Sequence, residues 1–241
     1  MLGRFLEFSI PTPDIGASLA FYERLGFSQA EVGEAWTHPY AVLTDGRLCL
    51  GLHQSDANET FLTFARPDLL KSLALIERQG VEFEYRNLGN DVFNEVAWRD
   101  PSGHLLRLVE ARTFSPSKRP ASDQSACGYF REIALPAPDR EAAKVFWERW
   151  GFVGIDEPEG PLPHTCCTSD TIDVGLYERG AISRPTLLFG SEDPAADLAR
   201  LAQRGIVPVR NLPALLRGSS LTLFTAPEGT PILIAAEPRP A

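Results

Sequence analysis

The sequence predicts an α+β fold made of two tandem copies, each containing two βαβββ modules. The first observation is a repeat: FLEFSIPTPDIGASLAFYERLGF at residues 5–27 recurs as FREIALPAPDREAAKVFWERWGF at residues 130–152. Later segments repeat in the same order, QGVEFEYRN with RGIVPVRN and DPSGHLLRL with APEGTPILI. The second observation is that strand-like and helix-like segments alternate within each copy. Self-similarity at a fixed spacing is typical of a duplicated structural unit, here of about 115 residues.

The predicted boundary between the copies is the segment TFSPSKRPASDQS at residues 113–125. This segment is rich in serine, proline and charge and has no apolar periodicity, which is typical of a linker. We therefore expect a first domain over residues 1–112 and a second over residues 126–237.

Each element of the first copy has its own signal. Residues 5–11 alternate as a strand does, and Asp14 is a suitable cap for a helix over residues 16–25 that Gly26 ends. Asp45-Gly46 predicts a tight hairpin within residues 40–53, because both positions tolerate a positive φ. The second module repeats this order, with a strand at 61–65, a helix between Asp68 and Gly80, and strands near 81–86, 92–99 and 104–110.

Composition excludes several classes of function. The chain has 241 residues, 44% of them hydrophobic, and a formal net charge of −9. That charge, with no local lysine or arginine stripe, argues against nucleic acid or an anionic membrane surface as a partner. No segment resembles a signal peptide or a membrane span of about 20 apolar residues, so we expect a cytoplasmic protein. Four cysteines at these spacings predict neither a disulfide scaffold nor a zinc motif.

The order strand, Pro-x-Pro-Asp, helix ending in FYERLGF, then RDPSGHLL resembles the vicinal oxygen chelate superfamily. That superfamily includes glyoxalase I, extradiol dioxygenases and bleomycin-binding proteins. The resemblance covers both copies and implies two glyoxalase-like domains, in each of which paired modules form curved mixed sheets around a cleft. It also implies a small-molecule ligand and a monomer resembling a fused dimer, or a homodimer. Fold alone does not decide among the lyases, oxygenases and drug binders of such a superfamily.

The resemblance further implies metal ligands on the first and last strands of each module. The corresponding residues, module by module, are Glu7 and His53, Phe61 and Arg107, Glu132 and Tyr177, and approximately Thr186 and Leu233. A divalent metal needs three or four convergent oxygen or nitrogen donors, and no pairing of these modules supplies three. We therefore predict no metal, and place a divalent cation, if there is one, near Glu7 and His53.

Arg107 suggests what replaces the metal. If Glu7 and Arg107 lie on adjacent strands, they are expected to form an ion pair in the space of the metal. In the functional interpretation both are catalytic: Arg107 holds a carboxylate or phosphate and Glu7 orients it or acts as a base. In the structural interpretation the pair only fills the space. Further ligand-binding candidates are Tyr40, His53, Phe61 and Trp98 in the first copy and Glu132, His164 and Tyr177 in the second.

Three functional hypotheses follow. The first is a metal-free binder of a small aromatic or anionic molecule. The second is an enzyme, either a metal-dependent lyase or a ring-cleaving dioxygenase. The third is a structural or interaction protein with closed clefts, for which Phe61 and Leu233 are the bulky residues.

Overall fold

The computed structural model describes residues 2–30, 38–111, 125–159, 162–178, 180–210, 212–213, 216–217 and 219–237. The first copy contains two βαβββ modules, as predicted. Its elements are β1 (Arg4–Thr12), α1 (Ile15–Arg24), β2 (Ser28–Ala30), β3 (Tyr40–Thr44), β4 (Cys49–Gln54), β5 (Phe61–Arg66), α2 (Leu69–Glu77), β6 (Tyr85–Asn87), β7 (Glu95–Arg99) and β8 (Leu105–Glu110).

The described residues of the second copy follow the same order, but without a strand that corresponds to β6. Its elements are β9 (Tyr129–Pro136), α3 (Arg140–Arg149), β10 (Val153–Glu157), β11 (His164–Thr168), β12 (Val174–Tyr177), β13 (Thr186–Ser191), α4 (Pro194–Gln203), β14 (Leu221–Thr225) and β15 (Pro231–Ala236). Residues 113–124 of the predicted linker lie outside the described residues, so the domain boundaries stay a prediction.

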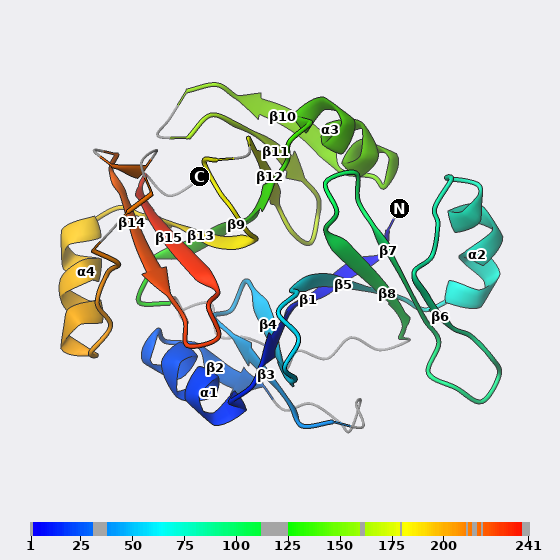
Figure 1. Cartoon of the computed structure of the whole chain (residues 1–241), viewed down its shortest axis with the longest axis horizontal. Coiled ribbons are helices and arrows are strands. Elements are labelled where there is room, and N and C mark those ends of the chain that lie inside the picture. Colours follow the sequence, from blue (N-terminus) through cyan, green and yellow to red (C-terminus); the bar gives the residue numbers. More distant parts are fainter. Residues whose placement is uncertain are drawn as a thin grey trace.

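The strands of each copy form one mixed sheet (Figure 1). The first sheet has the order β2-β3-β4-β1-β5-β8-β7-β6, and the second has the order β10-β11-β12-β9-β13-β15-β14. The two modules of a copy join where β1 pairs antiparallel with β5 and β9 with β13. Each site described below therefore belongs to a single copy.

The local signals explain where the elements begin and end. The Asp14 and Asp139 side chains accept hydrogen bonds from the backbone of Ala17 and Ala142 and so cap α1 and α3. Asp45 Oδ1 accepts from the backbone of Arg47 and Leu48 in the hairpin, where Gly46 has a φ of 96°. The strand expected at 81–86 is shorter than predicted, because only its end pairs with β7.

One apolar core joins the two copies. It contains residues of both sheets, such as Phe64 and Phe189, together with the buried faces of α1, α3 and α4. Side chains alternate between the faces of a sheet, so the residues between these core residues lie on the opposite face of each sheet. We call this opposite face the site face.

No helix in the part of the chain that the structure describes is long and apolar enough to cross a membrane. The cytoplasmic location stays a prediction.

Candidate functional site: a buried glutamate in each copy

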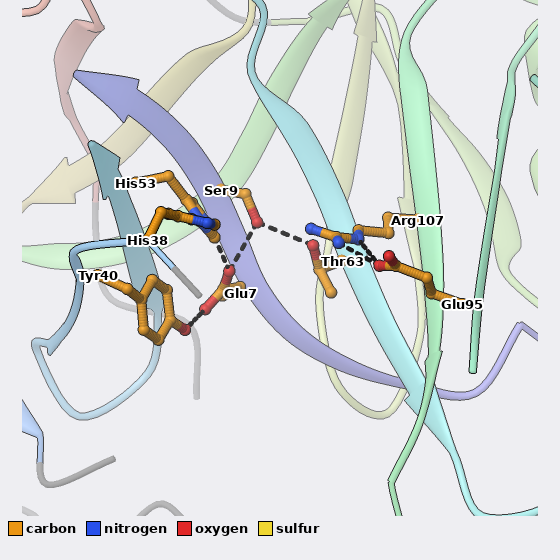
Figure 2. Close-up of polar contacts among 8 residues, drawn as sticks. All are labelled: Glu7, Ser9, His38, Tyr40, His53, Thr63, Glu95 and Arg107. Carbon is orange, nitrogen blue, oxygen red and sulfur yellow. Dashed lines mark hydrogen bonds and ion pairs between the residues drawn. The ribbon is translucent and has the colours of Figure 1, made fainter. Parts of the chain in front are cut away.

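Glu7 is the centre of a polar cluster on the site face of the first sheet (Figure 2). It is 1% exposed, and its Oε1 accepts a hydrogen bond of 2.7 Å from Ser9 Oγ. His53 Nε2 lies 3.1 Å from the same oxygen, and the Tyr40 hydroxyl donates to Oε2. Thr63 Oγ1 lies 2.8 Å from Ser9 Oγ. These five residues form the first-copy cluster.

Strand register brings these residues together. Glu7 is opposite Thr63 on β5, and Tyr40 on β3 is opposite His53 on β4. The glutamate side chain extends over β4, where a Cβ added at Gly51 would lie 2.2 Å from Glu7 Oε1. Because real Cβ atoms do not approach so closely, the absence of a side chain at Gly51 makes room for the carboxylate.

Two histidines extend the cluster into a hydrogen-bonded chain. His38 Nε2 lies 2.9 Å from His53 Nδ1, while the other ring nitrogen of His53 faces Glu7. A neutral imidazole has one donor and one acceptor nitrogen, so His53 can donate to the carboxylate and accept from His38. Burial, followed by the neighbouring His53 and Arg107, lowers the pKa of His38. This chain can move a proton between Glu7 and His38.

The predicted ion pair between Glu7 and Arg107 is wrong. Their strands are not adjacent, because β5 lies between β1 and β8, and Thr63 is opposite Glu7 on one side and Arg107 on the other. Arg107 pairs instead with Glu95 on β7, with 2.7 Å between Nε and Oε2 (Figure 2). The Glu95 carboxylate therefore neutralises the charge of the Arg107 guanidinium on the site face.

The aromatic candidates of the first copy divide into two groups. The His53 ring lies 4.8 Å from that of Tyr40 and 5.7 Å from that of Phe61, and Arg107 lies over the Phe61 ring at 5.6 Å. These residues do lie together. Trp98 does not join them, because its neighbour Ala97 is opposite Arg107 and Trp98 points into the core.

The second copy has a matching cluster around Glu132. This residue is 0% exposed, and the Tyr177 hydroxyl donates to its Oε1 over 2.5 Å. His164 Nε2 lies 3.4 Å from the same oxygen, and the His164 ring stacks on Tyr177 with 4.4 Å between centroids. These three residues, all predicted as ligand-binding candidates, form the second-copy cluster. His164 is the titratable partner of Glu132 that the sequence did not reveal.

Histidine and tyrosine have exchanged places between the copies. Tyr40 on β3 faces His53 on β4, whereas in the second copy His164 on β11 faces Tyr177 on β12. The register is equivalent in the two copies. β1, which carries Glu7, runs parallel to β4 with Pro11 opposite His53, and β9, which carries Glu132, runs parallel to β12 with Pro136 opposite Tyr177. Each copy therefore has a glutamate, a histidine and a tyrosine in contact, by a different arrangement.

The rest of the site face differs in polarity between the copies. Register pairs the polar residues of the first copy with apolar residues of the second: Ser9 with Ala134, Thr63 with Leu188, Arg107 with Leu233, and Glu95 with Leu221. The four apolar residues belong to a separate buried cluster. A hollow of about 350 Å³ borders Glu132 and Cys166, whereas the cavity beside His164, Tyr177 and Leu188 is about 30 Å³. That volume is about that of one water molecule.

The burial of the second-copy cluster shifts its pKa values. Burial alone would lower the pKa of His164, but the hydrogen bond and charge of Glu132 outweigh it and raise that pKa. Burial and the charge of Glu132 also raise the pKa values of Tyr177 and Cys166. The neutral thiol and phenol are therefore donors rather than nucleophiles at neutral pH.

The first-copy cluster does not match the donor set of a divalent metal site. The Glu7 carboxylate and the His53 imidazole are in contact, whereas His38 contacts His53, and the next residues across the sheet are Thr63 and Arg107. Within the described residues no group of three His, Cys, Asp or Glu side chains is placed to hold a metal ion.

Sequence reasoning missed Ser9, Thr63 and Glu95. The alternation of β1 from Glu7 would have placed Ser9 on the same face, and a threonine in FLTFAR is the one polar residue between apolar ones. Glu95 had no such signal, because its role depends on which strand pairs with β8.

Comparison with known proteins supports the fold and the family. The family model of the Glyoxalase/Bleomycin resistance protein/Dioxygenase superfamily matches residues 4–108. An extradiol ring-cleaving dioxygenase from B. fuscum aligns with a TM-score of 0.65 and 16% identity, over 98% of this chain and 72% of that one. The 2,3-dioxygenase LapB from Pseudomonas sp. KL28 aligns with a TM-score of 0.61 and 18% identity, over 98% and 94%. At these identities the likeness is one of fold.

Among curated proteins, epiplakin from Mus musculus is 31% identical over 121 residues, which are 46% of this chain and 2% of epiplakin. The chain thus spans a very small part of that protein. The first copy thus matches the glyoxalase/bleomycin resistance protein/dioxygenase superfamily, also called the vicinal oxygen chelate superfamily, and the fold of solved dioxygenases extends over nearly the whole chain.

Proposed function

We propose that the first-copy cluster binds a small aromatic molecule bearing a hydroxyl group, without a metal. The observation that supports this proposal is the contrast between the copies: the site face is polar around Glu7 and filled by leucines around Glu132. Burying polar side chains is costly, so a face that retains them in one copy alone favours a ligand there.

Charge selects among ligands. The Arg107 guanidinium is already neutralised by Glu95, so a ligand carboxylate or phosphate would have to compete with that pair. The Glu7 carboxylate accepts from Ser9, Tyr40 and His53, which leaves one of its roughly four acceptor positions for a ligand. A neutral hydroxyl can donate to that position, whereas an anion would be repelled by the carboxylate. This favours an aromatic ligand over an anionic one, the two kinds of ligand in the first hypothesis.

The rings of Tyr40, His53 and Phe61 provide the surface for the aromatic part of the ligand. Offset and edge contacts between rings add to the gain from burying apolar area. Glu7, rather than Arg107, then accepts the hydrogen bond from the ligand hydroxyl. The chain from His53 to His38 can carry a proton away from Glu7.

The test is binding of 2-naphthol, with 2-methoxynaphthalene as the analogue that lacks the hydroxyl donor. We expect saturable thermal stabilisation by 2-naphthol, weakened about tenfold in Glu7→Gln, since one hydrogen bond to a charged group is lost. Glu132→Gln is the matched control in the second copy and should leave binding unchanged. Equal binding of both naphthalenes, or equal loss in both variants, would contradict the proposal.

A metal-dependent lyase or ring-cleaving dioxygenase is the second candidate, favoured by the contact between Glu7 and His53. Elemental analysis of protein purified without chelators separates the two. One Fe, Mn, Ni or Zn per chain, lost in Glu7→Gln, would establish the metal-dependent candidate. For the second copy, the leucines at positions 188, 221 and 233 support a structural role for that part of the site face.

A further inference from the structure

The second sheet ends in an edge strand that carries exposed apolar side chains. β10 lies at one end of the strand order and pairs with β11, and no other described strand covers its far side. Val153 is 61% exposed and Ile155 is 51% exposed. In Figure 1, β10 lies at the rim of the molecule, next to α3. An edge of this kind presents unpaired backbone groups together with apolar side chains, which favours pairing with another strand.

The duplication supplies a comparison with the corresponding edge of the first sheet. Ser28 and Ala30 on β2 take the positions of Val153 and Ile155, because they follow the repeated Gly-Phe dipeptide at the same spacing and pair with equivalent positions of the next strand. β2 is also shorter, with three residues where β10 has five. The larger apolar side chains are thus specific to one of two related edges, and the fold itself does not require them.

The two faces of β10 have different neighbours. A Cβ added at Gly154 would lie 2.8 Å from the Lys144 side chain and 3.0 Å from Glu148 Oε1, so Gly154 faces α3. Side chains alternate along a strand, so Val153 and Ile155 project from the opposite face, which is the site face. A strand added at this edge would therefore meet apolar side chains on one face and the charged side chains of α3 on the other.

The charged residues of β10 are neutralised within the chain. Unpaired charges on an edge strand keep other strands away from it. Here Lys144 Nζ lies 3.0 Å from Asp156 Oδ2, and Arg131 forms an ion pair with Glu157. The two carboxylates of the strand therefore present little net charge to a second copy of the same strand.

A twofold axis at Ile155 makes the strand complementary to itself. In an antiparallel pair centred there, Ile155 is opposite Ile155 of the second copy, and Asp156 is opposite Gly154, which has no side chain. Lys144 lies over Gly154 and contacts Asp156 of its own chain. Each Lys144 ammonium group is then next to two carboxylates, one from each copy. This charge match favours a second copy of the chain over an unrelated strand.

We propose that β10 pairs antiparallel with β10 of a second copy of this chain, around a twofold axis at Ile155. The second sheet then continues across both molecules. A pair of five-residue strands buries less than the roughly 800 Å² per partner of a standard interface, so the dimer should be weak and depend on concentration. The proposal concerns assembly and is independent of the ligand proposed for Glu7.

Sedimentation velocity over about a hundredfold range of protein concentration tests the proposal. We expect the wild type to shift from monomer to dimer, and Ile155→Lys to associate at least tenfold more weakly, because the twofold axis places two like charges opposite each other. Ile155 is half exposed, so this variant should unfold at the same temperature as the wild type. Ala30→Lys, at the corresponding position of β2, is the matched control and should dimerise as the wild type does.

Cross-linking tests the register of the pair. With copper–phenanthroline as oxidant, Ile155→Cys should form a disulfide-linked dimer, because residue 155 is opposite itself. Val153→Cys should not, because residue 153 is opposite Glu157 of the second copy. The wild type, which has four cysteines, gives the background. A monomer at every concentration, undiminished association of Ile155→Lys, or equal cross-linking of the two cysteine variants overturns the proposal.

Discussion

At the residue scale, the two buried glutamates are the feature that the duplication has kept. Glu7 and Glu132 occupy equivalent positions, and each contacts one histidine and one tyrosine. Gly51 and Gly175 repeat as well, since a Cβ added at either would lie 2.2 Å from a glutamate oxygen. Room for the carboxylate on the neighbouring strand is therefore part of what defines the cluster.

We predict that Glu132→Gln lowers the pKa of His164. Burial by itself lowers this pKa, and the hydrogen bond and charge of Glu132 reverse the shift, so removing the charge leaves burial to dominate. The titration of the His164 ring followed by NMR measures this change. A pKa that is unchanged or higher in the variant would contradict it.

The same shift has a consequence for stability. Because the folded-state pKa of His164 is raised, the protonated imidazole stabilises the fold fully below its unfolded pKa of about 6.5. That contribution disappears as the pH rises through the higher folded pKa.

The sequence identified these residues more successfully than it identified their partners. Glu7, Tyr40, His53 and Phe61 were expected near one another and do lie together, as do Glu132, His164 and Tyr177. The partner of Arg107 was predicted wrongly, because periodicity shows which residues share a face but not which strands are neighbours. Trp98 was expected on the site face but lies in the core, because neighbouring residues of a strand point to opposite faces of the sheet.

At the scale of the element, β5 and β13 decide the character of the two site faces. Each is the inner strand that joins two modules, and each places one side chain opposite the glutamate: Thr63 in the first copy and Leu188 in the second. Both residues are at most 4% exposed. This buried position is one of the four at which the polar face of the first copy differs from the apolar face of the second.

We predict opposite effects for the two exchange variants at this position. Thr63→Leu should keep the protein folded but abolish stabilisation by 2-naphthol, because it replaces the hydroxyl that contacts Ser9 with the apolar side chain found in the second copy. Leu188→Thr should lower the free energy of unfolding by about 2–5 kcal/mol, because it leaves a cavity and buries a hydroxyl. Urea denaturation and thermal shift measure the two effects. A Thr63→Leu protein that still binds 2-naphthol would refute the role given to this strand.

Element boundaries followed from the sequence where side chains contact their own backbone. Asp14 caps α1 as predicted, and the Asp45-Gly46 hairpin is present. The strand near 92–99 begins only at Glu95, after Val92 and Phe93, which are exposed. These two apolar residues resemble the start of a strand in the sequence, but in the structure they precede it.

At the scale of the whole molecule, the copies are held by contacts that the repeat alone did not reveal. The apolar core is shared between the sheets, and polar contacts across it include Leu2 with Trp150 and His104 with Pro136. Glu228 bonds to Ser18 and Tyr22 at the opposite contact. A shared core predicts that the two copies unfold together.

We predict that Glu228→Ala lowers the free energy of unfolding by about 1–3 kcal/mol, because the Tyr22 hydroxyl is left buried without its acceptor. Glu178→Ala, which removes an exposed carboxylate in a 3.9 Å pair with Arg140, is the control and should change it by no more than about 0.5 kcal/mol. Urea unfolding followed by fluorescence and by circular dichroism should give one coincident transition for each protein. Two separate transitions would show that the copies are independent domains.

The exchange of histidine and tyrosine affects how relatives of this protein are recognised. Aligned residue by residue, the two copies differ at both positions, Tyr40 against His164 and His53 against Tyr177. Counted as facing pairs on neighbouring strands, they do not differ at all. Comparisons that score each position separately therefore underestimate how similar the two halves are. A search that treats paired strand positions as units would score the two halves as equal at these positions.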